Sequence, residues 1–456
     1  MLKNFFLLSL FITLFSGCDE KQRLSVEQPY WGTWQSSGYG YIVNIVEGKF
    51  TLYDIDSKYC VKQEVSSNDI SELLTHFEAF SNTKIGLGQS ANSKLYYFNR
   101  LDQLPSRCNR TVESSPPMVV DEFAIMMKEH YAFFDLRGVN WQERVEQAKS
   151  KVTAKTSDRK LFEIFSEMME GLNDGHLYIN ATLDGEPQRI GYGDSRILKP
   201  TLDKAFNQQS KIETRSEFGM EWYKRTLSNV EDLLNGEINY SANNQIIWGS
   251  VDDIGYIKIR NMYGFIEDGS LSKEIDVVSK SMDTILRELG RKSSIVIDLT
   301  TNSGGSDEIG RAIANYFTDK RVKLYSHSTL GSTEAPQEYF SKPSKTPYLG
   351  KVIIYTSDHT VSAAETFTMA MKALPNVIHV GTTTRGALSD ILDKTLSNGW
   401  EVGLSNMTYL DNDGKLWEGI GVVPDMELGV FTNENIFTSH LVTTRQLFNM
   451  LKTEQL

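Results

Sequence analysis

Cysteine is scarce in this chain of 456 residues, which has only Cys18, Cys60 and Cys108. No two of them form a Cys-x-x-Cys pair, and this excludes a zinc knuckle and a thioredoxin-type motif. The histidines have no His-x-x-x-His spacing, so neither a metal site nor a cofactor is expected. No long basic run occurs and the formal net charge is −12, which argues against nucleic acid as the main partner.

Two nucleotide-binding motifs are missing as well. The pair Gly304-Gly305 is not followed by Gly-Lys-Ser/Thr, and it is not part of a G-x-G-x-x-G pattern, which excludes a P-loop and a dinucleotide fold. Glycine allows the backbone to come close to a ligand and to present its N–H groups. A tight turn and a ligand-contacting loop both remain open at this pair.

A run long enough to span a membrane is also absent. The apolar stretch Phe5–Phe15 within Met1–Gly17 is short and is typical of a secretory signal peptide. Small residues precede Cys18, a pattern similar to a bacterial lipobox, which implies a lipid-anchored cysteine at the mature N-terminus. Ordinary secretion with loss of Cys18 is the alternative. Residues 18–28 are interpreted as a polar tether.

Both alternatives place the mature chain outside the cytosol, in a bacterial periplasm, and the lipobox adds a membrane anchor. Disulfides form and persist in such oxidising compartments. Cys60 and Cys108 are therefore a candidate disulfide.

Residues 29–113 are interpreted as a small β-rich domain. Tyr30–Asp56 contains apolar stretches with a period of two, divided at Glu47-Gly48, which predicts a hairpin. Leu95–Phe98 is another expected strand. A peptide- or partner-binding role and a purely structural role are both open for this domain.

A linker at Ser114–Pro117 is followed by three stretches of helical periodicity, which predict a small bundle over residues 118–180. The bundle ends in Asp174-Gly-His176, and a strand is expected directly afterwards. Residues 181–250 form a connecting region to which no fold is assigned, with one polar helix expected over Met220–Leu234. A peptide-binding module in this region is left open.

From residue 251 strands and helices alternate, which predicts an α/β domain with a central sheet over residues 251–430. Trp400–Gly421 is expected to form a hairpin, and residues 431–456 a closing helix. The expected strands are Ile254–Ile259, Ser294–Leu299, Val352–Tyr355 and Asn376–Val380, and the expected helices are Leu271–Leu289 and Asp307–Phe317.

Ser362 stands where the strand Val352–Tyr355 and a polar turn give way to a helix. The N-terminus of a helix has free backbone N–H groups and a partial positive charge, which stabilise an oxyanion. A serine placed there is a candidate nucleophile. Ser362-Ala-Ala-Glu365 also fits a capping box, which needs no chemistry at all.

Five segments, in order along the chain, resemble motifs of the C-terminal-processing (tail-specific) serine peptidases. The last three resemble the D-L-R-x-N-x-G-G motif, the nucleophile segment and the closing E-G-x-G-V-x-P-D motif of that family, and the first two are similar to the tricorn-core-like branch. The segments are Arg137–Trp141, Asp174–His176, Asp298–Gly305, Thr356–Glu365 and Trp417–Asp425.

The resemblance also indicates the general base. One branch of the family uses a serine–lysine dyad, but the corresponding position here is Ala387. The tricorn-like branch uses a histidine that matches His176, and its supporting glutamate matches Glu418. That branch also has an assisting serine before the histidine, and here this position is Gly175. Thr300 stands where the family usually has arginine, which implies the loss of a structural salt bridge.

The resemblance therefore implies an extracytoplasmic serine peptidase with a crotonase-like α/β catalytic domain, which cleaves peptides or unfolded protein tails. A catalytically inactive ligand- or peptide-binding module on the same fold is the main alternative, and a coenzyme-A-dependent crotonase-type enzyme is a third. The implied roles are Ser362 as nucleophile, His176 as general base, Glu418 as the group that orients the imidazole, and backbone N–H groups of Ala363 and of Gly304 or Gly305 as the oxyanion hole.

Overall fold

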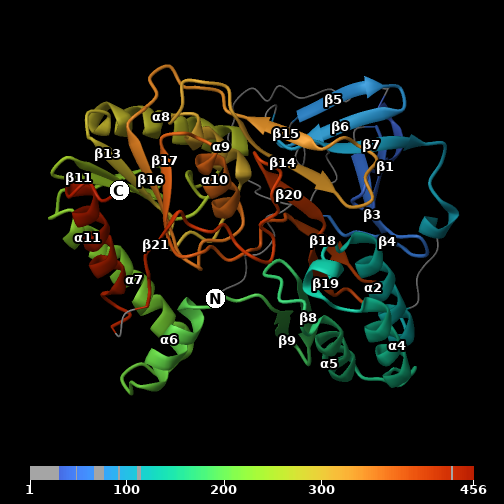
Figure 1. Ribbon diagram of the computed structural model, residues 1–456. Coiled ribbons are helices and arrows are strands. Elements are labelled where there is room, and N and C mark those ends of the chain that lie inside the picture. The colour runs from blue at the N-terminus through green and yellow to red at the C-terminus, as the bar shows by residue number, and fades with distance from the viewer. Residues whose placement is uncertain (1–29, 48, 66–75, 91–92, 110–113, 433–434) are drawn as a thin grey trace. The chain divides into compact units, whose positions relative to one another are not determined.

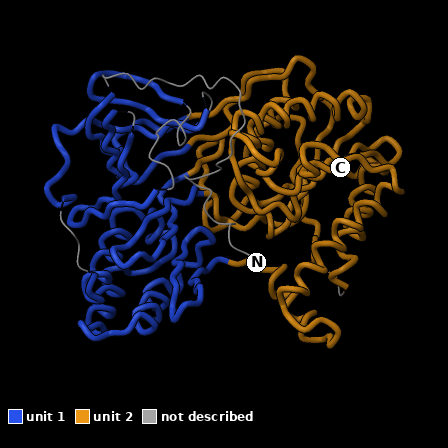
Figure 2. Tube along the Cα trace, turned by 180° about the vertical axis from the view of Figure 1, so that it is seen from behind, with its two compact units in different colours: residues 1–193, 327–337, 389–408 blue, residues 194–326, 338–388, 409–456 orange. Residues whose placement is uncertain are grey.

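The computed structural model describes residues 30–47, 49–65, 76–90, 93–109, 114–432 and 435–456. The predicted signal peptide, the tether and Cys18 lie outside these residues. Two compact units are formed (Figure 2). Unit 1 contains the described residues up to Gly193 with His327–Gln337 and Ser389–Thr408, and unit 2 contains Asp194–Ser326, Glu338–Leu388 and Tyr409–Leu456.

Unit 1 begins with an antiparallel sheet of seven strands within the described residues, which corresponds to the predicted β-rich region. Its order is β4-β3-β2-β1-β7-β6-β5. Tyr41–Val46 pairs with Lys49–Ile55 as the period-two pattern predicts, because alternate side chains enter the core of the sheet. The strands are β1 (Gly32–Ser36), β2 (Tyr41–Val46), β3 (Lys49–Ile55), β4 (Cys60–Lys62), β5 (His76–Ser81), β6 (Lys84–Gly88) and β7 (Tyr96–Leu101).

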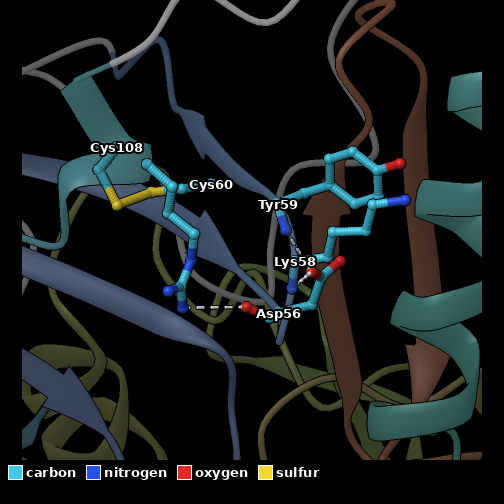
Figure 3. The surroundings of a disulfide bond; sticks show 6 residues. Asp56, Lys58, Tyr59, Cys60 and Cys108 are labelled. Carbon is cyan, nitrogen blue, oxygen red and sulfur yellow. Dashed lines mark hydrogen bonds between the residues drawn. A yellow bond between two sulfur atoms is a disulfide. The ribbon is translucent and has the colours of Figure 1, made fainter.

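A disulfide joins Cys60 of β4 to Cys108 of the short helix η2 (Ser106–Asn109). Figure 3 shows it beside the loop that contains Asp56, Lys58 and Tyr59. Both sulfur atoms lie in an apolar cluster with Ile42 and Ile55, so the bond closes the end of the sheet that β4 borders.

Three helices follow, as expected: α2 (Pro116–His130), α4 (Trp141–Lys151) and α5 (Asp158–Met169), with the one-turn α3 (Phe134–Arg137) between the first two. The predicted linker is shorter than expected because Pro116 and Pro117 are the first residues of α2. Proline is favourable there, since its fixed φ suits a helix and its missing N–H is not needed in the first turn.

The predicted hairpin over Trp400–Gly421 forms only around its turn at Asp411–Gly414, where Leu410 and Leu416 form an antiparallel bridge. Strand β19 (Glu401–Ser405) pairs with β18 (Ile391–Thr395) and with β8 (Tyr178–Leu183), in a sheet completed by β9 (Glu186–Gly191). Strand β20 (Met407–Asp411) belongs to another sheet, of order β15-β14-β20, with β15 (Gln337–Phe340) and β14 (Lys323–Thr329).

Because β18 and β19 pair with β8, residues 389–408 belong to unit 1, and the expected continuous domain over residues 251–430 is interrupted. A hydrophobic period predicts a strand but does not identify its partner.

Unit 2 has a mostly parallel sheet of order β10-β11-β12-β13-β16-β17-β21. Only the β10–β11 and β11–β12 pairs are antiparallel. The strands are β10 (Asn239–Ser241), β11 (Ile246–Val251), β12 (Ile254–Ile259), β13 (Ser294–Asp298), β16 (Lys351–Thr356), β17 (Val377–Gly381) and β21 (Met426–Glu427).

Helices cover both faces of this sheet, as an α/β fold requires. Figure 1 shows α8 (Leu271–Leu289), α9 (Asp307–Ala314) and α10 (Ala363–Lys372) on one side of the sheet, and α7 (Arg215–Leu233) and α11 (Ser439–Lys452) on the other. The core on the α7 and α11 side includes Tyr256, Val296, Ile353 and Tyr355, which alternate with residues facing the other helices.

The connecting region of residues 181–250 is thereby resolved. Besides β9, β10 and β11 it contains α6 (Leu198–Asn207) and α7, which is longer than the predicted helix, and α6 and α7 share the core of unit 2. Helices α6 and α7 therefore pack as a pair on the central sheet of unit 2. None of the described helices is both long and apolar enough to cross a membrane.

Candidate active site

Ser362 lies at the turn between β16 and α10, where it is the N-cap residue of the helix. Its φ of 62° and ψ of −131° are unusual for a residue with a side chain. Such strained positions occur where the surrounding structure holds a functional group in place. A sharp, strained strand-to-helix turn of this kind exposes a serine hydroxyl beside the N–H groups of the helix.

The carboxylate of Glu365 holds this turn from inside the protein. It is fully buried and accepts the N–H groups of Ser362 (3.1 Å), Gly386 (2.7 Å) and Ala387 (2.9 Å), as well as the hydroxyl of Thr384 (2.6 Å). Burial raises the pKa of Glu365, and the four hydrogen bonds oppose this shift. The capping residue predicted from the sequence therefore also binds the segment 384–387.

Gly304 and Gly305 lie against the same turn. Both have positive φ, 92° and 141°, so glycine is required at both positions. A Cβ atom on Gly304 would lie 2.6 Å from the Cβ of Ser362, and one on Gly305 would lie 2.5 Å from the carbonyl oxygen of Met262. The structure thus brings the glycine pair and the serine together, as the sequence predicted.

The two glycines differ in the use of their N–H groups. The N–H of Gly304 donates to Oδ1 of Asn302 (2.9 Å), which closes the loop on itself. Among the described residues, the N–H groups of Gly305 and Ala363 donate to no acceptor. Only these two amides of the candidate oxyanion hole are therefore available to a ligand.

Asp298, at the end of β13, fixes the start of this glycine loop. Its buried carboxylate accepts both the N–H (2.8 Å) and the hydroxyl (2.7 Å) of Thr300. Lys258 Nζ lies 3.2 Å from the other carboxylate oxygen. A lysine of the neighbouring strand β12 thus forms an ion pair with this buried carboxylate.

Glu418 is buried in the turn that follows β20. One of its oxygens accepts the N–H of Leu388 at 2.8 Å. The N–H of Gly419 also donates to the carbonyl of Gly386 (2.8 Å), so this turn and the segment 384–388 are bound together. Glu365 and Glu418 hold the same segment, and the carbonyl of Ala387 in it accepts the N–H of Ser362 (3.1 Å).

His176 belongs to unit 1, whereas the other candidate residues named above belong to unit 2. The His176 N–H donates to Oδ1 of the buried Asp174 (2.9 Å), and the hydroxyl of Ser405 on β19 donates to the same oxygen (3.1 Å). The hydroxyl of Tyr131 (3.0 Å) and the guanidinium of Arg137 (3.9 Å) lie at Oδ2. The two tricorn-like segments therefore meet at Asp174.

His359 is the other histidine near the nucleophile in sequence, and its surroundings disfavour proton uptake. Its ring packs edge-on against Trp222, with 6.2 Å between centroids, and its Nδ1 lies 3.4 Å from a nitrogen of Arg385. Burial and the neighbouring guanidinium both lower the pKa of His359. Such a half-buried ring is a poor general base.

Sequence reasoning missed several residues that shape this site. Asp174 and Glu365 stand inside the quoted motifs, but their role became visible only from their burial. Lys258 and His440 both contact Asp298 but stand outside the motifs. The only sign of them in the sequence is a polar, ionisable residue within an apolar strand for Lys258 and within an amphipathic helix for His440.

Part of this chain matches a known protein family, and its fold is similar to that of solved structures. Residues 253–428 match peptidase family S41. The structure is similar to that of a candidate peptidase from Parabacteroides merdae, with a TM-score of 0.58 and 21% identity over 74% of this chain and 97% of that chain. It is also similar to mature CPAF, with a TM-score of 0.51 and 14% identity over 75% of this chain and 98% of that chain.

At these identities the two structures show the fold alone, and the predicted crotonase-like α/β class is confirmed. The family match covers the glycine loop, the serine turn and the closing motif. Residues 253–428 therefore match the peptidase domain of family S41, and the chain is a serine-type peptidase.

Proposed function

We propose that this peptidase cleaves peptides or unfolded protein tails outside the cytosol by acyl-enzyme chemistry at Ser362. The observation that carries the proposal is the strained backbone of Ser362, at the N-terminus of α10 and in contact with the glycine loop. Nucleophilic serines need this kind of exposure beside N–H donors.

In the first step Ser362 Oγ attacks the carbonyl carbon of the scissile peptide, and its proton passes to His176. The tetrahedral oxyanion accepts the N–H groups of Gly305 and Ala363, because of the three candidate amides only that of Gly304 already has an acceptor among the described residues. The C–N bond then breaks, and His176 returns the proton to the leaving amine.

A water molecule hydrolyses the resulting acyl ester, with His176 again taking and returning the proton. Glu418 orients the imidazole and stabilises its protonated form. Support for His176 as the base is its rigid backbone, held by Asp174, and the match of the Asp174–His176 segment to the tricorn-like branch. The role of Glu418 is supported by its burial in the closing motif.

The proposed location rests on two features. Met1–Gly17 has the pattern of a signal peptide, with Cys18 at a lipobox-like position for a lipid anchor. The bond between Cys60 and Cys108 also fits an oxidising compartment such as the bacterial periplasm.

The experiment is labelling with a fluorophosphonate probe combined with hydrolysis of a general peptide substrate. Ser362→Ala is expected to abolish both, while the melting temperature stays close to that of the wild type. The matched control is Ser272→Ala, which removes an exposed hydroxyl on α8 and should change neither. Full hydrolysis by Ser362→Ala would end the assignment.

The alternative is an inactive ligand- or peptide-binding module on the same fold. The same experiment separates the two, because a binding module would bind peptides without labelling at Ser362 and without turnover. Retention of the glycine pair, the strained serine and a free pair of N–H donors favours the enzyme.

A further inference from the structure

The carboxylate of Asp298 is the meeting point of a buried polar cluster in unit 2. Besides Thr300 it binds Tyr256, Lys258 and His440. His440 Nε2 lies 2.7 Å from Oδ2 of Asp298, and the hydroxyl of Tyr256 donates to the same oxygen. All of these side chains are buried, so Asp298 is held from strand β12, from Thr300 in the loop after β13, and from the C-terminal helix α11.

Burial and neighbouring charges shift the pKa values of Asp298 and His440. Burial would raise the pKa of Asp298, but the positive charge of Lys258 and the hydrogen bond from His440 lower it well below the usual range. Burial lowers the pKa of His440. Since Nε2 faces a carboxylate oxygen, Nε2 carries the N–H that donates, and Nδ1 has no hydrogen-bond partner among the described residues.

Hydrogen bonds, joined by the backbone between Leu299 and Thr300, connect His440 to the glycine loop. Oδ1 of Asp298 accepts the N–H of Thr300, and the carbonyl of Thr300 accepts the hydroxyl of Ser357 (2.6 Å). The carbonyl of Leu299 accepts the N–H of Asn302 (2.9 Å). Asn302 in turn accepts the Gly304 N–H, next to Gly305 in the chain.

Helix α11 has other contacts that keep His440 at this carboxylate. The hydroxyl of Tyr355 on β16 donates to Thr443 (2.9 Å), and the ring of His440 stacks on Phe431 with 6.4 Å between centroids. The Tyr355–Thr443 hydrogen bond and the Phe431 ring therefore hold His440 in place beside Asp298.

We propose that His440 is a positioning residue of the active site: through Asp298 and Thr300 it sets the geometry of the glycine loop that carries the Gly305 N–H. The C-terminal helix thereby becomes part of the catalytic apparatus without touching substrate. This inference deepens the proposed function, on which its catalytic part rests.

Two amide variants of equal chemistry test the inference. Gln at position 440 can place its amide nitrogen where Nε2 of the histidine lies, whereas Asn is one methylene shorter and cannot reach Asp298. For His440→Asn we expect kcat per titrated active site to fall about 10- to 100-fold with KM little changed, since a displaced oxyanion donor acts in the transition state. His440→Gln is expected to stay within about threefold of the wild type.

Hydrogen exchange of the segment 299–305 supplies a measurement that does not depend on turnover. His440→Asn should accelerate exchange there about tenfold and leave exchange in α8 unchanged, and His440→Gln should not accelerate it. Tyr256→Phe, which removes another donor to the same oxygen without changing shape, is the second variant if His440→Asn does not fold.

The positioning role would be overturned if hydrogen exchange of the segment 299–305 were unchanged in His440→Asn. If that variant does not fold, unchanged exchange in Tyr256→Phe would overturn it instead. Wild-type kcat per active site in a variant with accelerated exchange would overturn the catalytic part. If the wild type itself showed no labelling at Ser362, the proposed function would fail, and the exchange result would still decide the link from α11 to the loop.

Discussion

Gly304 and Ser362 are packed so closely that a Cβ atom on the glycine would lie 2.6 Å from the Cβ and 3.1 Å from the Oγ of the serine. Both residues have positive φ. The glycine loop and the serine turn therefore fit together only as long as position 304 has no side chain.

Gly304→Ala is expected to lower kcat/KM by at least about 100-fold, because the methyl group displaces either Ser362 or the adjacent Gly305 donor. Gly414→Ala is the matched control, since Gly414 also has positive φ (84°) but no atom within 4 Å of the added methyl group. The control should lose only about 1 kcal/mol of stability and no activity. Equal loss of activity in both variants would show that backbone strain alone is responsible.

Glu365→Gln should destabilise the protein by about 2 to 4 kcal/mol in denaturant unfolding. The amide replaces one acceptor oxygen by a donor, which then faces N–H groups that are already donors and are buried. Activity should fall as well, since Ser362 loses its fixed backbone. The exposed Glu427→Gln is the control, and equal stability of the two variants would contradict the prediction.

His176→Ala should lower kcat at least about 1000-fold, and Glu418→Ala by a smaller factor, because proton transfer contributes more than orientation of the ring. The measurement is kcat at a saturating peptide concentration, corrected for the titrated active sites. The reverse order would require another residue as the base.

Glu122 gives the stability of unit 1 a dependence on pH. Burial raises its pKa from 4.5 to about 7, with the nearby Asp56 and Asp54 acting in the same direction. The folded chain therefore binds this proton more tightly than the unfolded chain, and the contribution to stability is present at low pH and lost as the pH rises through about 7. Glu122 lines a small cavity together with Lys394, His130 and Tyr59.

The stability of Glu122→Gln relative to that of the wild type should therefore rise as the pH is raised from 5 to 8, by on the order of 3 kcal/mol at most. The measurement is thermal unfolding of both proteins at the two pH values. The control is Glu143→Gln, at an exposed position of α4. Its difference in stability from the wild type should be the same at pH 5 and pH 8. A pH-independent difference for Glu122→Gln would refute the assignment.

Thiol titration of the unreduced, denatured mature protein should find neither Cys60 nor Cys108 free. Replacing both by serine should lower the free energy of unfolding by about 4 kcal/mol, because the bond spans 48 residues and restricts the unfolded chain. Two reactive thiols in the unreduced protein would contradict the pairing.

Much of the fold could be predicted because local patterns repeat with the period of each element. The period of two gave β2 and β3, and the helical period gave α2, α4 and α5. The hairpin over Trp400–Gly421 was right only at its turn, because β19 pairs with β8, far away in sequence, and period alone does not identify a partner.

The sequence by itself determined most kinds of element, the resemblance to a peptidase family and the positions of Ser362, Gly304 and Gly305, since these depend on residue types at fixed local spacing. Only the tertiary structure decided which amides remain free for an oxyanion, and that Lys258 and His440 support Asp298. The physical reason is that hydrogen bonding and burial depend on neighbours in space, and these come from chain segments that no local pattern connects.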